Sequence, residues 1–132
     1  MSIFVDTSAI FALVDGDDAN NKRAKRVWEQ FISERKRLIT TNYVIVESFS
    51  LFQKRLGTDS ARDFYQDLCP LMSVQWVDAV AHNAGMAAAV AASSKKLSLV
   101  DCVSFVVMRR LGLQKVFTFD RHFREQGFTR LP

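Results

Sequence analysis

The chain has 132 residues, of which 48% are hydrophobic and 24% are charged, and its formal net charge at pH 7 is +4. This length favours a single domain over residues 1–132 with one core, and the composition excludes a disordered or fibrous chain. Because no apolar run approaches about 18 residues, the sequence argues against a membrane span, while the basic balance favours polyanionic partners.

The first part of the chain alternates short apolar segments with longer amphipathic ones. Ile3–Val5 predicts a buried strand, followed by a short helix over Ser8–Val14 and a polar loop over Asp15–Asn21. A helix is predicted over Asn21–Arg37, because apolar side chains recur on one face at helical spacing. Leu38–Thr41 has the apolar, β-branched character of a second strand.

The middle of the chain predicts two helices and a strand. Asn42 is expected to cap a helix that Gly57 ends, and Thr58 is expected to cap a second helix that ends before Pro70. Val74–Val77 then predicts a third strand.

The last third of the chain continues the alternation. Asp78 is expected to cap an alanine-rich helix, and Ser98 a further helix that Gly112 ends. Strands are predicted over Lys115–Phe119 and near Phe128–Leu131, with a short helix between them. The whole pattern indicates an α/β fold with a mostly parallel sheet of four to five strands and helices on both faces.

Four acids in four separate segments lie next to apolar sequence. Asp6 follows the first strand, Glu47 lies on the helix after the second, Asp101 lies in the first turn of an apolar helix, and Asp120 follows the fourth strand. Ligand sites in such sheets form beyond the carboxyl ends of the strands. Clustered carboxylates raise one another's pKa values, and Mg²⁺ or Mn²⁺ would relieve that repulsion and could serve phosphodiester cleavage. We therefore interpret Asp6 as a metal ligand.

Structural roles are open for the same residues. Asp101 fits a Ser-x-x-Asp capping box, Asp120 can cap the following helix, and Glu47 can pair with a basic neighbour. Ser8 and Thr118 can donate hydrogen bonds to the carboxylates or to metal-bound water, or they can serve local turns.

In chain order, these acids and their surroundings resemble the PIN-domain family, in particular the VapC-like toxins of bacterial toxin–antitoxin pairs. The resemblance covers essentially the whole chain and lies in FVDTSAIFAL, TTNYVIVES, LSLVDCVSFVVMRRLG and VFTFDRHFREQGF. It implies a three-layer α/β/α fold, Mg²⁺ or Mn²⁺ dependence and cleavage of single-stranded RNA. It also implies a homodimer and an antitoxin that plugs the cleft. The metal site implied by the resemblance consists of Asp6, Glu47, Asp101 and Asp120, accompanied by Ser8 and Thr118.

Other functions fit parts of the pattern. A stand-alone PIN-domain nuclease that processes RNA would share the motifs, and a catalytically dead RNA-binding scaffold would share the fold but not the four acids. An aspartyl-phosphate phosphatase or signalling receiver also places an acid after the first strand. However, Ser8 stands where such a phosphatase needs a second Asp, and Lys115 begins its strand where a receiver needs a lysine at the strand end. A DEDD-type exonuclease would need Glu two residues after Asp6.

Basic and aromatic residues add expectations about partners and location. Arg121, His122 and Arg124 follow the last of the four acids and are placed to hold phosphates. Eleven phenylalanines are many for a chain this short, so we expect part of segment 21–56 to form a dimer or antitoxin surface. Because Asp6 interrupts the N-terminal apolar run, the chain lacks a secretory pattern, and we expect a cytoplasmic protein without a membrane partner.

Overall fold

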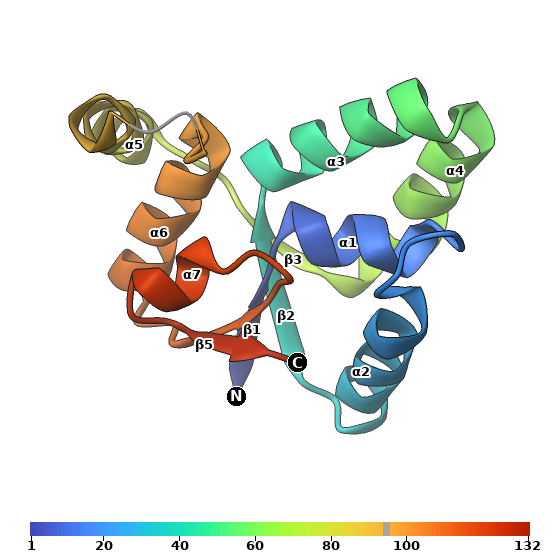
Figure 1. The fold of residues 1–132 in the computed structure, drawn as a ribbon. Coiled ribbons are helices and arrows are strands. Elements are labelled where there is room, and N and C mark those ends of the chain that lie inside the picture. The colour runs from blue at the N-terminus through green and yellow to red at the C-terminus, as the bar shows by residue number, and fades with distance from the viewer. Residues whose placement is uncertain (94–95) are drawn as a thin grey trace.

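The structure is a computed structural model and describes residues 1–93 and 96–132. Its centre is a five-stranded, all-parallel sheet with the strand order β3–β2–β1–β4–β5 (Figure 1). The strands are β1 (Ser2–Val5), β2 (Arg37–Thr41), β3 (Ser73–Gln75), β4 (Lys115–Phe117) and β5 (Thr129–Leu131). Because all the strands run the same way, their carboxyl ends lie along one edge of the sheet.

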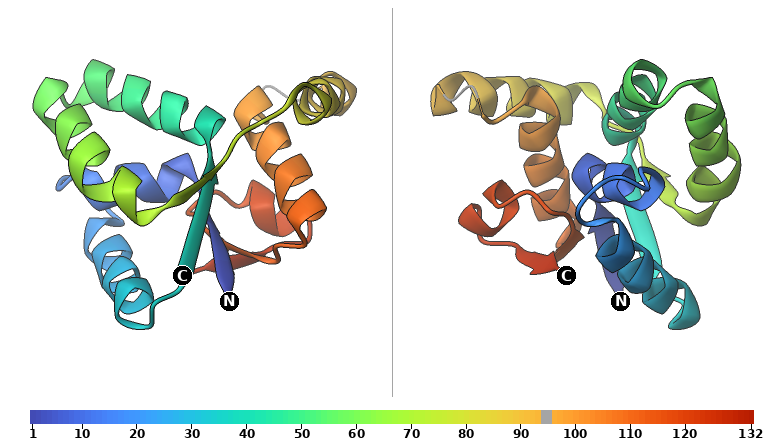
Figure 2. Two further views of the ribbon diagram at one scale, coloured as in Figure 1. Left: turned by 180° about the vertical axis from the view of Figure 1, so that it is seen from behind. Right: turned by 45° about the vertical axis from the view of Figure 1, so that its right-hand side comes forward.

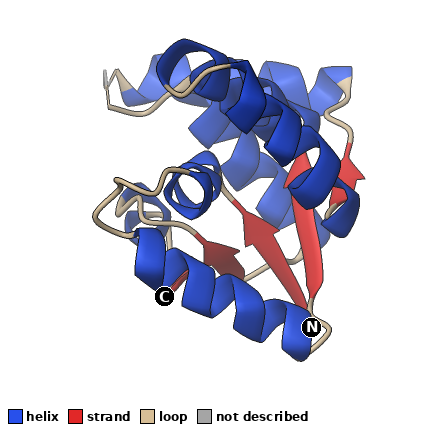
Figure 3. Ribbon diagram, turned by 90° about the vertical axis from the view of Figure 1, so that its right-hand side faces the viewer, coloured by secondary structure: helices blue, strands red, loops and turns tan. Residues whose placement is uncertain are grey.

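Helices cover both faces of the sheet, which confirms the expected three-layer α/β/α fold. Helices α1 to α4 lie on one side, and α5, α6 and α7 lie on the other (Figures 1 and 2), with the strands between the helical layers (Figure 3). The helices are α1 (Thr7–Val14), α2 (Asn21–Ser33), α3 (Asn42–Arg55), α4 (Thr58–Asp63), α5 (Ala79–Ala92), α6 (Leu99–Leu111) and α7 (His122–Glu125). Among the described residues, none of these helices has the length and apolar character needed to cross a membrane.

The hydrophobic core lies on both faces of the sheet around β1 and its neighbour β4. Ile3–Val5 is buried on both sides, which explains its uninterrupted apolar sequence. On one face, the ring of Phe31 from α2 meets the ring of Phe117 edge-on at 5.3 Å between centroids. In the other layer, Phe105 of α6 packs against Phe123 of α7 at 5.0 Å.

Two helix ends differ from the predictions. The helix predicted to reach Arg37 ends at Ser33, because Arg35 adopts a positive φ of 54° and the chain turns there into β2. The helix predicted to continue to Pro70 ends at Asp63. It is followed by a π-helical turn (Phe64–Leu68) and a 3₁₀ turn (Cys69–Leu71).

Two predicted helix caps differ by one position. Thr58 was expected to cap α4, but it is the first residue of that helix, and Gly57 stands at the cap with a φ of 96° and no side-chain hydrogen bond. Thr41, rather than the predicted Asn42, caps α3, because its Oγ1 accepts the N–H of Val44 at 3.2 Å. The side-chain oxygen of Asn42 instead accepts the N–H of Val77 at 2.8 Å. Val77 therefore lies outside the third strand, which ends at Gln75.

Three other helix ends are confirmed. Asp78 caps α5 by accepting the N–H of Ala81 at 2.8 Å. Ser98 caps α6 through a capping box, and Gly112 ends that helix in the left-handed region with a φ of 67°.

The segment 21–56 supplies most of its apolar side chains to the core. Trp28 and Phe52 are buried, and the exposed apolar side chains of this segment are Ile32 and Val46. Most of the large apolar side chains that the described residues expose lie elsewhere, for example Trp76 and Val90. The number of phenylalanines is therefore explained by the core, and a partner surface on segment 21–56 stays a prediction.

Helices α5 and α6 approach most closely at Gly85. A Cβ atom at this position would lie 2.4 Å from Cγ2 and 3.2 Å from Cα of Val103. Alanine would gain about 1 kcal/mol of helix propensity, but overpacking against a β-branched side chain costs about 1–3 kcal/mol. We expect Gly85→Ala to lower the free energy of unfolding in urea titrations. In a Val103→Ala background, which lacks Cγ2 but keeps the close backbone contact, the same change should cost less than in the unmodified protein; stabilisation of the unmodified protein by Gly85→Ala would contradict this packing.

Candidate active site at the carboxyl edge of the sheet

The four acids lie at the same edge of the sheet, although they follow or belong to different strands and helices. Asp6 directly follows β1 and caps α1, and Asp120 follows the neighbouring strand β4. Glu47 lies in the second turn of α3, which begins directly after β2 on the other side of β1. Asp101 lies in the first turn of α6. The parallel order β2–β1–β4 therefore brings side chains from distant parts of the sequence together.

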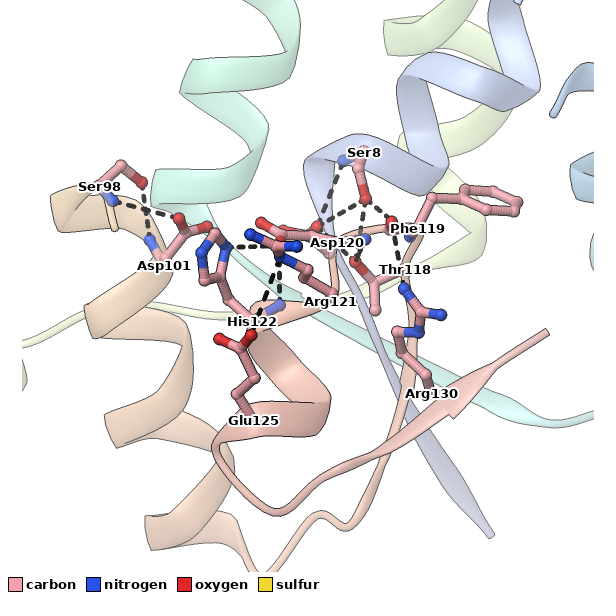
Figure 4. A network of polar contacts seen from close by, with 11 residues as sticks. Ser8, Ser98, Asp101, Thr118, Phe119, Asp120, Arg121, His122, Glu125 and Arg130 are labelled. Carbon is pink, nitrogen blue, oxygen red and sulfur yellow. Dashed lines mark hydrogen bonds and ion pairs between the residues drawn. The ribbon is translucent and has the colours of Figure 1, made fainter. Parts of the chain in front are cut away.

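Asp6 is held by two hydroxyl groups. Its Oδ2 accepts hydrogen bonds from Ser8 Oγ at 2.9 Å and Thr118 Oγ1 at 2.8 Å, with a longer contact to the Ser8 N–H (Figure 4). The hydroxyl oxygens in turn accept the N–H groups of Phe119 and Asp120, at 2.9 and 3.0 Å. Because both oxygens accept an amide N–H, each hydroxyl keeps its own proton to donate, and Asp6 Oδ2 is an acceptor within reach of both; the two hydroxyl oxygens also lie 2.9 Å apart. All described hydrogen bonds to the Asp6 carboxylate end on Oδ2, so Oδ1 could bind a cation.

The hydrogen bonds of Phe119 and Asp120 also correct the end of the fourth strand. That strand was expected to continue through Phe119 but ends at Phe117. The N–H of Thr118 still bonds to the carbonyl of Leu131 in β5, but the N–H groups of Phe119 and Asp120 bond to the side chains of Ser8 and Thr118. Phe119 and Asp120 thus bond to the hydroxyls of Ser8 and Thr118 instead of extending the sheet.

Burial and mutual repulsion dominate the electrostatics of the site. Burial raises the pKa of Asp6 to about 6; hydrogen bonds from Thr118 and Ser8 oppose this rise, and the Asp101 carboxylate adds to it. Burial also raises the pKa of Glu47, which a hydrogen bond from Thr7 opposes and the charge of Asp6 reinforces.

Asp101 is subject to the same effects. Burial raises its pKa, its hydrogen bonds to Ser98 oppose the rise, and the charges of Asp120 and Glu47 reinforce it. Each of the four acids therefore acts electrostatically on another, which means that the site gathers negative charge in a poorly solvated place.

Two of the acids also have the structural roles left open by the sequence. Asp101 Oδ2 accepts the Ser98 N–H at 3.1 Å, and Ser98 Oγ accepts the Asp101 N–H at 3.0 Å, so the capping box is present. Asp120 Oδ1 accepts the His122 N–H at 2.9 Å at the start of α7. Each of these contacts engages a single carboxylate oxygen, so neither excludes binding of a cation by the other oxygen.

Two further residues contact the acids of the site. Sequence reasoning assigned Thr7 no role there, and it assigned His122 a different role. Thr7 lowers the pKa of Glu47 through its hydroxyl and accepts a weak hydrogen bond from Ser48 Oγ at 3.5 Å. His122, expected to hold phosphates, directs its Nδ1 to Asp120 Oδ1 at 2.6 Å instead (Figure 4). The Asp-x-His spacing in the sequence could have suggested this second contact.

The spacing of these carboxylates suits a divalent cation that keeps some of its water ligands better than one that is coordinated by protein side chains alone. Within the described residues, no three Asp, Glu, His or Cys side chains already lie at mutual distances suited to direct coordination. Mg²⁺ keeps several waters and commonly uses one or two carboxylates, so it tolerates wider spacing than a structural metal does. A cation would also offset the repulsion that raises the pKa of Asp6.

The receiver alternative requires a lysine near the acid after the first strand. Lys115 lies at the opposite end of β4, where its Nζ lies 3.2 Å from the sulfur of Met1. This position argues against an aspartyl-phosphate site.

Comparisons with known proteins agree with this arrangement. The PIN-domain family profile matches residues 3–128. The chain is 34% identical over 127 residues to a protein named 23S rRNA-specific endonuclease VapC20, from two strains of Mycobacterium tuberculosis. The aligned region covers 96% of this chain and 95% of the relative.

Solved structures show the same relationship. The crystal structure of Mycobacterium tuberculosis VapC20, described as a sarcin–ricin loop cleaving toxin, has a TM-score of 0.85 and 32% identity over 96% of each chain. FitAcB from Neisseria gonorrhoeae has a TM-score of 0.71 over 100% of this chain and 97% of its own, but at 15% identity it shows the fold alone. Profile, sequence and structure agree that the chain belongs to the PIN-domain family, in its VapC-like group.

Proposed function

We propose that this protein is a divalent-metal-dependent endoribonuclease that cleaves single-stranded RNA as the toxin of a type II toxin–antitoxin pair. The observation that carries the proposal is the convergence of Asp6, Glu47, Asp101 and Asp120 at one sheet edge of a VapC-like chain. Shared negative charge at the carboxyl edge of a parallel sheet is the arrangement that a catalytic Mg²⁺ or Mn²⁺ site needs.

Each side chain has a separate task in this proposal. Asp6 offers Oδ1 to the cation, while Ser8 and Thr118 fix its other oxygen. Glu47 and Asp101 approach from the helices on opposite sides and complete the negative site. A bound divalent cation would lower the pKa of water and offset the charge that develops on the phosphate.

Residues next to the acids would position the site and its substrate. His122 would hold Asp120 in place through the contact to Oδ1. The exposed guanidinium of Arg121 lies near the same site, and its ion pair with Glu125 is long, at 3.8 Å, so Arg121 could exchange that contact for a phosphate (Figure 4).

The partners follow from membership of the VapC-like group. We propose an exposed loop of ribosomal RNA as substrate, by analogy with VapC20, whose name specifies 23S rRNA. We also propose a cognate antitoxin and a homodimer. Growth arrest on induction, relieved by co-expression of an adjacent small DNA-binding protein, would support the toxin role over a stand-alone RNA-processing nuclease.

Asp101→Asn is expected to abolish cleavage while leaving the fold intact, because asparagine preserves the capping oxygen but removes the charge. The assay follows cleavage of a synthetic sarcin–ricin loop RNA with Mg²⁺, with Mn²⁺ and with EDTA. Asp67→Asn, at an exposed acid outside the site, serves as the matched control. Normal metal-dependent activity in Asp101→Asn would refute the assignment, and absence of Mn²⁺ binding in calorimetry of the unmodified protein would favour a dead RNA-binding scaffold.

A further inference from the structure

Helices α1 and α3 leave the acid site side by side and in the same direction (Figure 1). Thr7, in the first turn of α1, contacts Ser48, in the second turn of α3, through the two hydroxyls. One turn further along both helices, the ring of Phe11 stacks on the ring of Phe52, with centroids 5.9 Å apart and planes at 12°. The matched spacing of these two contacts shows that the helices run in register away from the acids.

A positively charged side chain, that of Arg55, lies at the far end of this helix pair. The guanidinium of Arg55, the last residue of α3, lies over the half-buried ring of Phe11 at 5.8 Å from its centroid. At 1.5 Å per residue, Arg55 is about 12 Å from Glu47 along the helix axis. This separation exceeds the size of the scissile phosphate group but is within reach of an oligonucleotide bound across the site.

The contact with Phe11 orients Arg55 without occupying its hydrogen-bond donors. Arg62 and Arg110 direct theirs to the carboxylates of Asp59 and Asp78, at 3.0 and 3.3 Å. A guanidinium over an aromatic ring instead interacts through its face, and its N–H groups at the edge stay available for an oxyanion.

A purely structural role at the helix end explains less of this geometry. A basic residue in the last turn does favour the helix dipole. However, the carbonyl of Phe52 near the end of α3 already accepts the N–H groups of Leu56 and Gly57, at 2.9 and 2.8 Å. The dipole also gives no reason for the guanidinium to lie on a ring of another helix.

We propose that Arg55, oriented by Phe11, binds a backbone phosphate of the RNA at a subsite remote from the four acids. This inference rests on the proposed nuclease function and extends it, because it assigns a direction to the RNA along the α1–α3 pair. Arg55 is a positioning residue: it increases affinity for the strand and touches no reacting atom. A phosphate contact carries no base specificity, so its loss affects all sequences alike.

The test compares Arg55→Gln with Arg23→Gln, which removes an exposed arginine from α2. Binding of a fluorescein-labelled single-stranded RNA dodecamer is measured by anisotropy in EDTA over a range of salt concentrations. Arg55→Gln should weaken binding about fivefold to tenfold and reduce the slope of log K against log salt by about 0.7. Arg23→Gln should leave both values unchanged. Phe11→Leu, which keeps the positive charge but removes the ring, should weaken binding less and leave the slope unchanged.

Cleavage kinetics distinguish the possible failures. With Mg²⁺, Arg55→Gln should raise KM by the same factor and leave kcat unchanged. If the unmodified protein cleaves RNA and Arg55→Gln binds like Arg23→Gln, the subsite is overturned and the nuclease function stands. If the unmodified protein neither binds nor cleaves RNA, the proposed function fails and the subsite fails with it. Melting temperatures of all variants exclude unfolding as the cause.

Discussion

Asp6→Asn is expected to abolish RNA cleavage and, in the absence of metal, to make the protein more stable. In the proposed site, loss of this ligand should slow cleavage about a thousandfold or more, because a bound divalent cation would supply several kcal/mol to the transition state. The gain in stability has a different origin. Burial raises the pKa of Asp6 from 3.8 to about 6, so at neutral pH the folded protein holds a carboxylate in a place that disfavours its charge.

The size and sign of this effect follow from the two pKa values. Between pH 3.8 and about 6 the folded state binds more protons at Asp6 than the unfolded state does. The free energy of unfolding of the metal-free protein therefore falls as pH rises through this window. It stays lower above the window by about 3 kcal/mol. Asparagine has no charge, and its side-chain oxygen can accept the hydrogen bonds of Thr118 and Ser8 in place of Oδ2.

Urea titrations in EDTA at about pH 4.5 and pH 8 test this prediction. The unmodified protein should lose stability between the two pH values, whereas Asp6→Asn should change much less and be the more stable protein at pH 8. Asp67→Asn should behave as the unmodified protein does. Destabilisation of metal-free protein by Asp6→Asn at pH 8 would show that the carboxylate is stabilised in the fold by something other than a cation.

Binding of Mg²⁺ or Mn²⁺ is expected to weaken steeply below pH 6. A cation needs ionised carboxylates, so protons compete with it at Asp6, whose pKa is about 6. Below this value Asp6 alone should reduce the apparent affinity about tenfold per pH unit. Because burial also raises the pKa values of Glu47 and Asp101, the decrease should be steeper than for one group.

Calorimetric titration with Mn²⁺ at several pH values between about 5 and 8 measures this dependence. The heat should include proton release near pH 6, which is detected as a dependence of the apparent enthalpy on the ionisation enthalpy of the buffer. The pH profile of cleavage should follow the profile of metal affinity at subsaturating metal. An affinity independent of pH over this range would mean that Asp6 is not a ligand.

Much of the fold could be predicted because its determinants are local. Asp78 and Ser98 are good caps, and Gly112 ends a helix with a φ that other residues rarely adopt. The element ends that differ depend on distant contacts or on strained backbone. Thr41 replaces Asn42 as a cap because the Asn42 side chain bonds to a residue far along the chain.

The sequence predicted the acids of the site and the two hydroxyls that support Asp6, those of Ser8 and Thr118, but it did not predict every supporting contact. An acid directly after a buried strand, such as Asp6, has a weak structural explanation in sequence, and the parallel fold then fixes where it lies. The contact between Thr7 and Ser48 joins two helices that are far apart in the sequence, and it depends on side-chain directions that periodicity does not give. Asp101 shows that capping and participation in the acidic cluster can coincide in one residue.

The support of Asp6 from the far end of the sequence has a consequence for biosynthesis. Thr118, which donates to Asp6, lies 112 positions later, and the N–H of Asp6 itself bonds to the carbonyl of Phe117 in β4. A polypeptide still being translated lacks both partners until residues 117 and 118 have been synthesised. The surroundings of Asp6 therefore stay incomplete while the preceding residues are made, and in the proposed nuclease the ability to cut RNA would arise late in synthesis.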